Sequence, residues 1–105
     1  MSNHYTVDYF IEKFSKIPDE QWTTGNYAMD GKCCALGHCG RRHGFRHEPP
    51  DATALDVLFS SSPVSDESLI SPTAVNDGLD ERFRQPTPKA RILAALNCIK
   101  ERQVK

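Results

Sequence analysis

The segment GKCCALGHCGRRHG, residues 31–44, concentrates the side chains of this chain that can do chemistry. It holds three cysteines, two histidines and two arginines. Thiols and imidazoles bind zinc, and a cysteine beside a histidine can act as a nucleophile with its base. A cysteine is also a small apolar side chain that packs well in cores. Three interpretations therefore compete: a metal site, a nucleophile, or a packed helix that carries thiols.

A metal site would use the pairs Cys34 with His38 and Cys39 with His43, each four residues apart. At about 100° per residue, the two pairs point roughly 140° away from each other on a helix. One helix therefore cannot converge all four side chains on a single ion. No CxxC or HxxxH motif outside residues 31–47 supplies further ligands. We expect no metal and no cofactor, with zinc bound through Cys34 and His38 or through Cys39 and His43 as the alternative.

The nucleophile interpretation depends on Cys34, which we place in the first turn of a short helix over residues 33–43. Free amides and the helix dipole at that position favour a thiolate. His38 follows one turn later on the same face as the candidate base, and Asp77 or Asn76 could orient it if the fold brings that turn close to the helix. This alternative is a small cysteine-dependent enzyme with Cys34, His38 and Asp77 as its catalytic residues.

A packed helix accounts for more of the segment. Gly37, Gly40 and Gly44 share one face of the expected helix, and each costs roughly 1 kcal/mol there relative to alanine. Such a cost indicates that another element approaches this face closely. Cys34 would then be buried and inert. Cys34→Ser should therefore destabilise more than Cys34→Ala, because it places a hydroxyl group among apolar atoms.

Length and composition place the chain among small soluble proteins. Its 105 residues suffice for a single domain, residues 1–105, with one modest core. A formal net charge of −1 argues against nucleic acid as a partner. No apolar stretch approaches the ~20 residues of a membrane span, and the first ten residues lack a signal-peptide pattern. We therefore expect a cytoplasmic protein, with no membrane contact and with free, reduced cysteines.

Hydrophobic periodicity predicts a mainly α fold of about four helices. Beside the short cysteine helix, we expect helices over residues 6–16, residues 51–59 with Asp51 as the cap, and residues 88–102 with Thr87 as the cap. Residues 60–72 should form a polar surface loop with a helical turn. The predicted core-facing residues are Val7, Phe10, Ile11, Phe14, Leu55, Leu58, Phe59, Ile92, Ala95, Leu96 and Ile99.

Turn residues separate these helices. Asp30-Gly31 is a tight-turn signal, and Trp22 and Tyr27 could lie on extended pieces around it. A short β-hairpin within residues 21–33 and an irregular loop anchored by Trp22 both fit this segment. A second turn is expected at residues 76–78.

Several short motifs resemble a family of small uncharacterised bacterial and phage proteins that form a domain of unknown function. They are Trp22, Gly25, Asp30-Gly31, Cys34-Ala35-Leu36-Gly37, Val75-Asn76-Asp77 and the terminal PTPKARILAALNCI helix. The similarity covers about residues 5–103. His38-Cys39 departs from it, because the family pattern has an alanine after the glycine. The resemblance implies a shared fold, and it implies no activity.

These observations favour a small non-catalytic binding protein, of the kind that serves a phage or a mobile element as an accessory factor. Two turns could line a cleft beside the cysteine helix. Arginines near the end of that helix form a positive patch that suits an anionic ligand or an acidic protein partner; they are Arg41, Arg42 and Arg46. The candidate binding residues are Trp22, Asp30, Arg41, Asn76 and Asp77.

Overall fold

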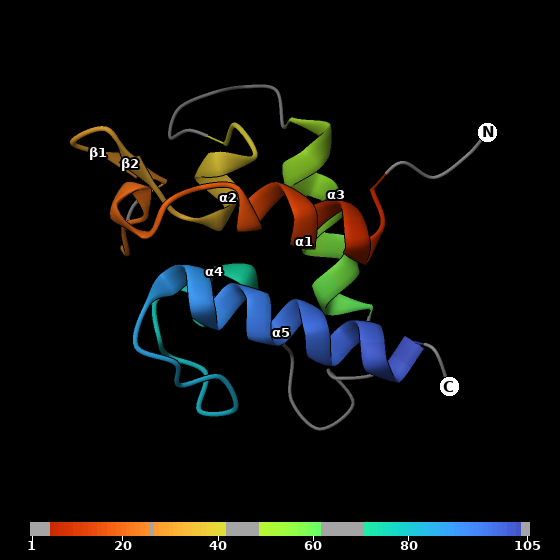
Figure 1. Cartoon of the computed structure of the whole chain (residues 1–105). Helices are drawn as coiled ribbons and strands as arrows, with labels where there is room; N and C mark the ends of the chain where they lie inside the picture. Colours follow the sequence, from red (N-terminus) through yellow and green to blue (C-terminus); the bar gives the residue numbers. More distant parts are fainter. Residues whose placement is uncertain (1–4, 26, 42–48, 62–70, 104–105) are drawn as a thin grey trace.

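A computed structural model describes residues 5–25, 27–41, 49–61 and 71–103, and the structural statements below concern these residues. They form a mainly helical fold with one small antiparallel hairpin, as predicted (Figure 1). In chain order the elements are α1 (Val7–Ser15), the 3-10 helix η1 (Asp19–Gln21), β1 (Ala28–Met29), β2 (Lys32–Cys33), α2 (Ala35–His38), α3 (Pro50–Ser60), α4 (Pro72–Asn76) and α5 (Pro88–Gln103).

Helices α1 and α5 lie side by side and run in opposite directions (Figure 1). Their facing stripes are apolar, as the periodicity predicted, and Phe10 and Phe14 of α1 have no exposed surface. At one end of the pair, Lys100 of α5 forms an ion pair with Asp8 of α1, with Nζ 2.7 Å from Oδ1. Helix α4 packs on α5, and α2 contacts α3, α4 and α5. The fully buried residues of α5 are Ile92, Ala95, Leu96 and Ile99.

Local capping explains where the two long helices begin. The Thr6 hydroxyl accepts a hydrogen bond from the amide of Tyr9 at 3.2 Å, and the Thr87 hydroxyl accepts one from Ala90 at 3.1 Å. Each bond satisfies an amide that the helix itself leaves without a partner. The predicted starts of both helices are therefore confirmed. Pro18 prevents α1 from continuing, as expected.

The predicted Asp30-Gly31 turn closes the hairpin. Asp30 has a φ of 55° and Gly31 a φ of 79°, and two successive left-handed residues characterise the two-residue turns that match the twist of the strands. Met29 pairs with Lys32 across the turn. Trp22 adds a parallel bridge to Cys33 on the other side of β2.

Two helices have other bounds than predicted. Helix α2 has only four residues, because Cys34 is its N-cap and Cys39 its C-cap, and Gly40 turns the chain away with a φ of 102°. Helix α3 is preceded by Pro49, so Asp51 lies in its first turn and is not its cap. Residues 42–48, which include Gly44 and the end of the expected cysteine helix, lie outside the described residues, as do residues 62–70 of the expected loop.

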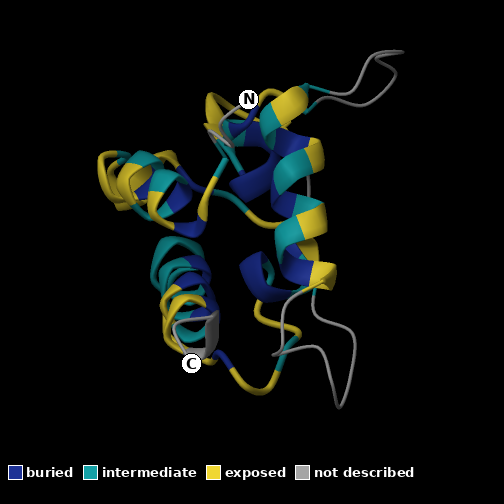
Figure 2. Ribbon diagram, turned by 90° about the vertical axis from the view of Figure 1, so that its right-hand side faces the viewer, coloured by how far each residue is buried: buried dark blue, intermediate teal, exposed yellow. Residues whose placement is uncertain are grey.

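The core lies between the helices, and their inward faces form its boundary (Figure 2). Nearly all of the fully buried large side chains are apolar, and Asn76 at the end of α4 is the polar exception among them. A buried amide needs hydrogen-bond partners, so Asn76 marks the point where polar groups converge inside the fold. None of the described helices has the length and apolar character needed to cross a membrane.

Candidate functional site

Cys34 joins the hairpin to α2. Its backbone is extended, with φ −83° and ψ 179°, and its Sγ accepts a hydrogen bond from the amide of Gly37 at 3.5 Å. Its own amide donates to the carbonyl oxygen of Tyr27 at 3.2 Å. The thiol therefore does the work of an N-cap side chain, a position that usually carries serine, threonine, asparagine or aspartate.

Gly37 is fixed by a close backbone approach. A Cβ atom at this position would lie 1.8 Å from the carbonyl oxygen of Tyr27. That contact is far inside van der Waals distance, so only glycine fits. The prediction that a glycine of this segment meets another element closely is correct for Gly37. Gly40 instead ends the helix. A Cβ atom at this position would lie 3.3 Å from Cγ of Pro49.

Asn76 connects three segments. Its Oδ1 accepts a hydrogen bond from the amide of Ala35 at 3.1 Å, which caps α2 from outside that helix. Its Nδ2 donates to the carbonyl oxygen of Thr23 at 2.9 Å and to Oδ1 of Asp77 at 3.0 Å. Both amide hydrogens are therefore in use. The side chain holds α4, the start of α2 and the chain before the hairpin at one point.

Asp77 and Arg91 extend this network. Oδ1 of Asp77 also accepts the amide of Gly25 at 3.1 Å. The guanidinium group of Arg91 donates to the carbonyl oxygen of Asn76 through Nε at 3.2 Å and Nη2 at 2.8 Å, and through Nη1 to Gln85 at 2.9 Å. A cation at the last carbonyl groups of a helix stabilises its C-terminus. Sequence reasoning missed Arg91, because its partner lies fifteen residues earlier in the chain.

The environment of the two buried thiols disfavours thiolate. Burial raises the pKa of Cys34 above its ordinary value of 9.0, hydrogen bonds from the amides of Gly37 and Leu36 oppose this, and the Asp77 carboxylate adds to the increase. Burial likewise raises the pKa of Cys39 to about 12. Both thiols are therefore protonated at neutral pH, and a protonated thiol is a weak nucleophile.

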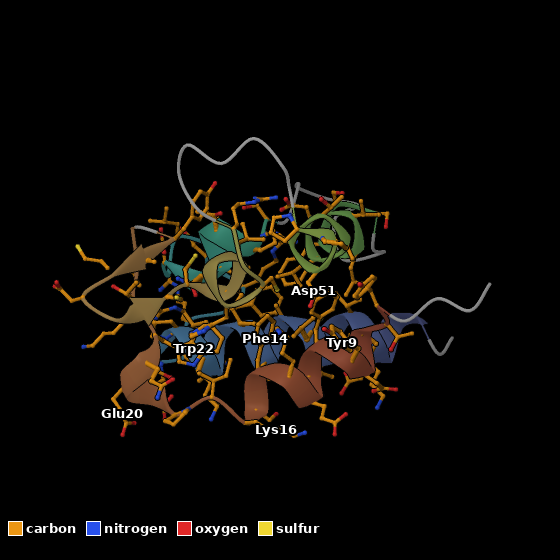
Figure 3. The ribbon with its side chains drawn as sticks, turned by 90° about the horizontal axis from the view of Figure 1, so that it is seen from above. Tyr9, Phe14, Lys16, Glu20, Trp22 and Asp51 are labelled. Carbon is orange, nitrogen blue, oxygen red and sulfur yellow. The ribbon has the colours of Figure 1, made fainter. Side chains whose placement is uncertain are left out.

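Trp22 and His38 lie together in the core region. The Trp22 side chain is only 5% exposed, and its ring centre is 4.7 Å from that of His38 and 5.4 Å from that of Phe14, both in edge-on geometry. Its Nε1 donates to the carbonyl oxygen of Ile17 at 3.4 Å. Figure 3 shows Trp22 beside Phe14, above the ribbon of α5. Trp22 is thus enclosed by protein rather than presented to a ligand.

The remaining predicted site residues are dispersed. Nη2 of Arg41 lies 2.6 Å from Oδ2 of Asp56, and its guanidinium carbon lies 5.7 Å from the centre of the Tyr27 ring. Asp30 is exposed at the hairpin turn. Three candidates of the arginine patch and the metal site, Arg42, His43 and Arg46, lie outside the described residues. Among the residues that are described, no three histidine, cysteine or acidic side chains form a metal-binding group.

A second polar cluster connects α1 to α3. The Tyr9 hydroxyl donates to Oδ2 of Asp51 at 2.5 Å, and Nζ of Lys13 lies 3.8 Å from the same oxygen. Tyr9 and Asp51 face each other across the two helices (Figure 3). The hydrogen bond to the carboxylate raises the pKa of Tyr9 to about 12. Sequence reasoning assigned Asp51 a capping role and missed this contact, which joins residues far apart in the chain.

The chain matches no protein-family model, and no curated protein or solved structure matches it either. The resemblance to the bacterial and phage family therefore stays a prediction.

Proposed function

We propose that this protein is a small non-catalytic binding protein in which the cysteine segment has a structural role. One observation carries the proposal: Asn76, the buried polar side chain at the centre of the candidate site, makes its hydrogen bonds to the protein itself. Both hydrogens of Nδ2 are donated internally, so the amide has no donor left for a substrate. A side chain whose hydrogen bonds all serve the fold supports a structural role for the cysteine segment that it contacts.

Cys34 supports the same assignment. A cysteine nucleophile needs an accessible thiolate, whereas this thiol is 5% exposed, caps α2, and has a raised pKa. Arg41 is paired with Asp56, so its charge is partly neutralised within the protein. This pairing argues against an anionic ligand or an acidic partner at Arg41, Arg42 and Arg46, which we keep as the second candidate.

We place the binding surface at the end of the molecule that carries the hairpin and the segment after α4 (Figure 1). The hydrogen bond between Gly25 and Asp77 ties the chain before the hairpin to the end of α4. The hairpin and the segment after α4 each present a large exposed apolar side chain, with Met29 46% and Leu79 73% exposed. Exposed apolar side chains of this size suit contact with a protein partner.

Thiol reactivity tests the structural role. The native protein is treated with iodoacetamide at neutral pH, and each labelled cysteine is located by mass spectrometry. We expect Cys33 and Cys98, which are partly exposed, to react first, and Cys34 and Cys39 to react only as the protein opens. Fast and selective labelling of Cys34 that is slowed in His38→Ala would instead support the enzyme with Cys34, His38 and Asp77.

Two further measurements separate the alternatives. One zinc ion per chain by elemental analysis would support zinc binding through Cys34 and His38 or through Cys39 and His43. For the binding surface, a photo-crosslinking amino acid is placed at position 29 or 79, with position 15 on α1 as the exposed control. A discrete adduct from 29 and 79, absent from 15 and competed away by unmodified protein, supports the assigned surface. Equal adducts at all three positions contradict it.

A further inference from the structure

The chain contains two Asp-Gly pairs, Asp30-Gly31 and Asp77-Gly78. In such a pair the glycine nitrogen can attack the aspartate Cγ, because glycine has no side chain to obstruct the approach. A bond forms between N and Cγ, and one water molecule leaves with the carboxyl oxygen. Hydrolysis of the resulting succinimide at its α-carbonyl takes up one water and gives isoaspartate. The mass is unchanged and no oxidant is needed.

Both reacting groups of the first pair are open. Asp30 and Gly31 are exposed at the hairpin turn, and a Cβ at Gly31 would meet nothing within 4 Å. Within the described parts of the chain, the Asp30 carboxylate accepts no hydrogen bond and the Gly31 amide donates none. Ring closure requires rotation about the backbone of this turn. A hairpin with two residues in each strand opposes such a rotation only weakly.

Both reacting groups of the second pair are held. Oδ1 of Asp77 accepts hydrogen bonds from Gly25 and Asn76, and the Gly78 amide donates to the carbonyl oxygen of Val75 at 3.2 Å. The Arg91 guanidinium group covers Gly78, because a Cβ atom at this position would lie 3.3 Å from Cζ of Arg91. The nitrogen cannot reach Cγ until this network opens.

We propose that Asp30 is the site of isoaspartate formation in the native protein and that the fold protects Asp77. The product carries its main chain through Cβ and Cγ, so it adds one atom to the two-residue turn and leaves a free α-carboxyl group. Enzymes that methylate the carboxyl group of isoaspartate would accept this turn as a substrate. Only strand β2 separates the altered turn from Cys34, so we expect the change to affect the hairpin and the start of α2.

The test ages the full-length folded protein at neutral pH and body temperature. Trypsin then places the two pairs on separate peptides, residues 17–32 and 47–82. Electron-transfer fragmentation, together with methylation by an isoaspartyl methyltransferase, measures isoaspartate in each peptide. We expect accumulation at Asp30 and a rate at least about tenfold lower at Asp77, since the second site reacts only from opened molecules.

The same incubation in concentrated guanidinium chloride is the matched control, and there the two sites should react at similar rates. Asp30→Glu should remove the signal from the first peptide, because glutamate closes the larger ring poorly. Asp30→Asn should react faster than the parent. Its ring closes with loss of ammonia and is then hydrolysed by water, so the exchange of ammonia for water reveals the reaction as a small net gain in mass. Equal rates at both sites in the folded protein, or protection of Asp30 as strong as that of Asp77, would overturn the proposal.

Discussion

At the scale of single residues, Cys34 lies just before the first turn of α2 rather than inside it, and this difference changes the role of its sulfur atom. Inside the first turn of a helix its thiol would have been presented to solvent or packed among apolar side chains. As the N-cap, it instead accepts the amide of Gly37. A sulfur atom accepts hydrogen bonds weakly, so this cap is poorer than the oxygen that serine would offer.

Substitutions at Cys34 should therefore follow capping ability. We expect Cys34→Ser to be more stable than Cys34→Ala by about 1 kcal/mol, the usual difference between the two residues at an N-cap. This order is the reverse of the one expected from the sequence. Urea unfolding followed by Trp22 fluorescence gives both values, and an alanine variant as stable as the serine variant would refute the capping argument.

Trp22 should be a large contributor to stability. Its side chain is 5% exposed and lies between Phe14 and His38, so Trp22→Ala should lower the free energy of unfolding by about 3 kcal/mol or more. Circular dichroism must follow the transition, because the variant lacks the tryptophan. Glu20→Ala, an exposed neighbour on η1, should change stability by less than about 0.5 kcal/mol. An unchanged midpoint for Trp22→Ala would show that the ring is dispensable.

At the scale of elements, sequence reasoning succeeded where the cause is local. Each threonine cap bonds an amide three residues later, and the apolar stripes of α1 and α5 repeat every three or four residues. The limits of α2 could not be predicted in the same way, since no periodicity exists in four residues. The role of Asn76 could not be predicted either. Its partners Ala35 and Thr23 lie 41 and 53 residues away, and only the packed helices bring them together.

Asn76 should accordingly be among the most sensitive polar positions. Asn76→Ala leaves the amide of Ala35 and the carbonyl group of Thr23 without this partner, and each such group costs about 1–3 kcal/mol when it is buried. We expect a loss of about 3 kcal/mol in the free energy of unfolding, measured by urea denaturation. Asn97→Ala is the matched control, since that amide is exposed and bonds only within α5. Equal effects of the two substitutions would contradict the role given to Asn76.

At the scale of the whole molecule, alkaline pH should unfold the protein. In the folded state the pKa of Tyr9 is raised from 10.0 to about 12 and that of Cys39 from 9.0 to about 12, and the pKa values of Cys34 and Tyr5 are also raised. A group with a raised folded pKa favours the folded state fully below its unfolded value. That contribution is lost as the pH rises towards the folded value. Stability should thus fall between pH 9 and pH 12.

The measurement is the urea midpoint as a function of pH, under reducing conditions. Tyr9→Phe removes one titrating group and should make the decline above pH 10 shallower. Because Tyr9 is partly exposed, solvent screening reduces its share, and the buried Cys39 should account for more of the decline. A midpoint that stays constant from pH 9 to pH 12 would contradict the expectation.

The antiparallel pairing of α1 with α5 also determines when this chain can fold. Helix α1 is synthesised well before α5, which covers its apolar stripe, and the ion pair between Asp8 and Lys100 joins residues far apart in the chain. Native contacts of such long sequence separation form only after the intervening loop closes. The nascent protein therefore cannot complete its core one piece at a time. Until α5 has been made, the apolar stripe of α1 that carries Phe10 and Phe14 lacks this cover and is open to chaperones.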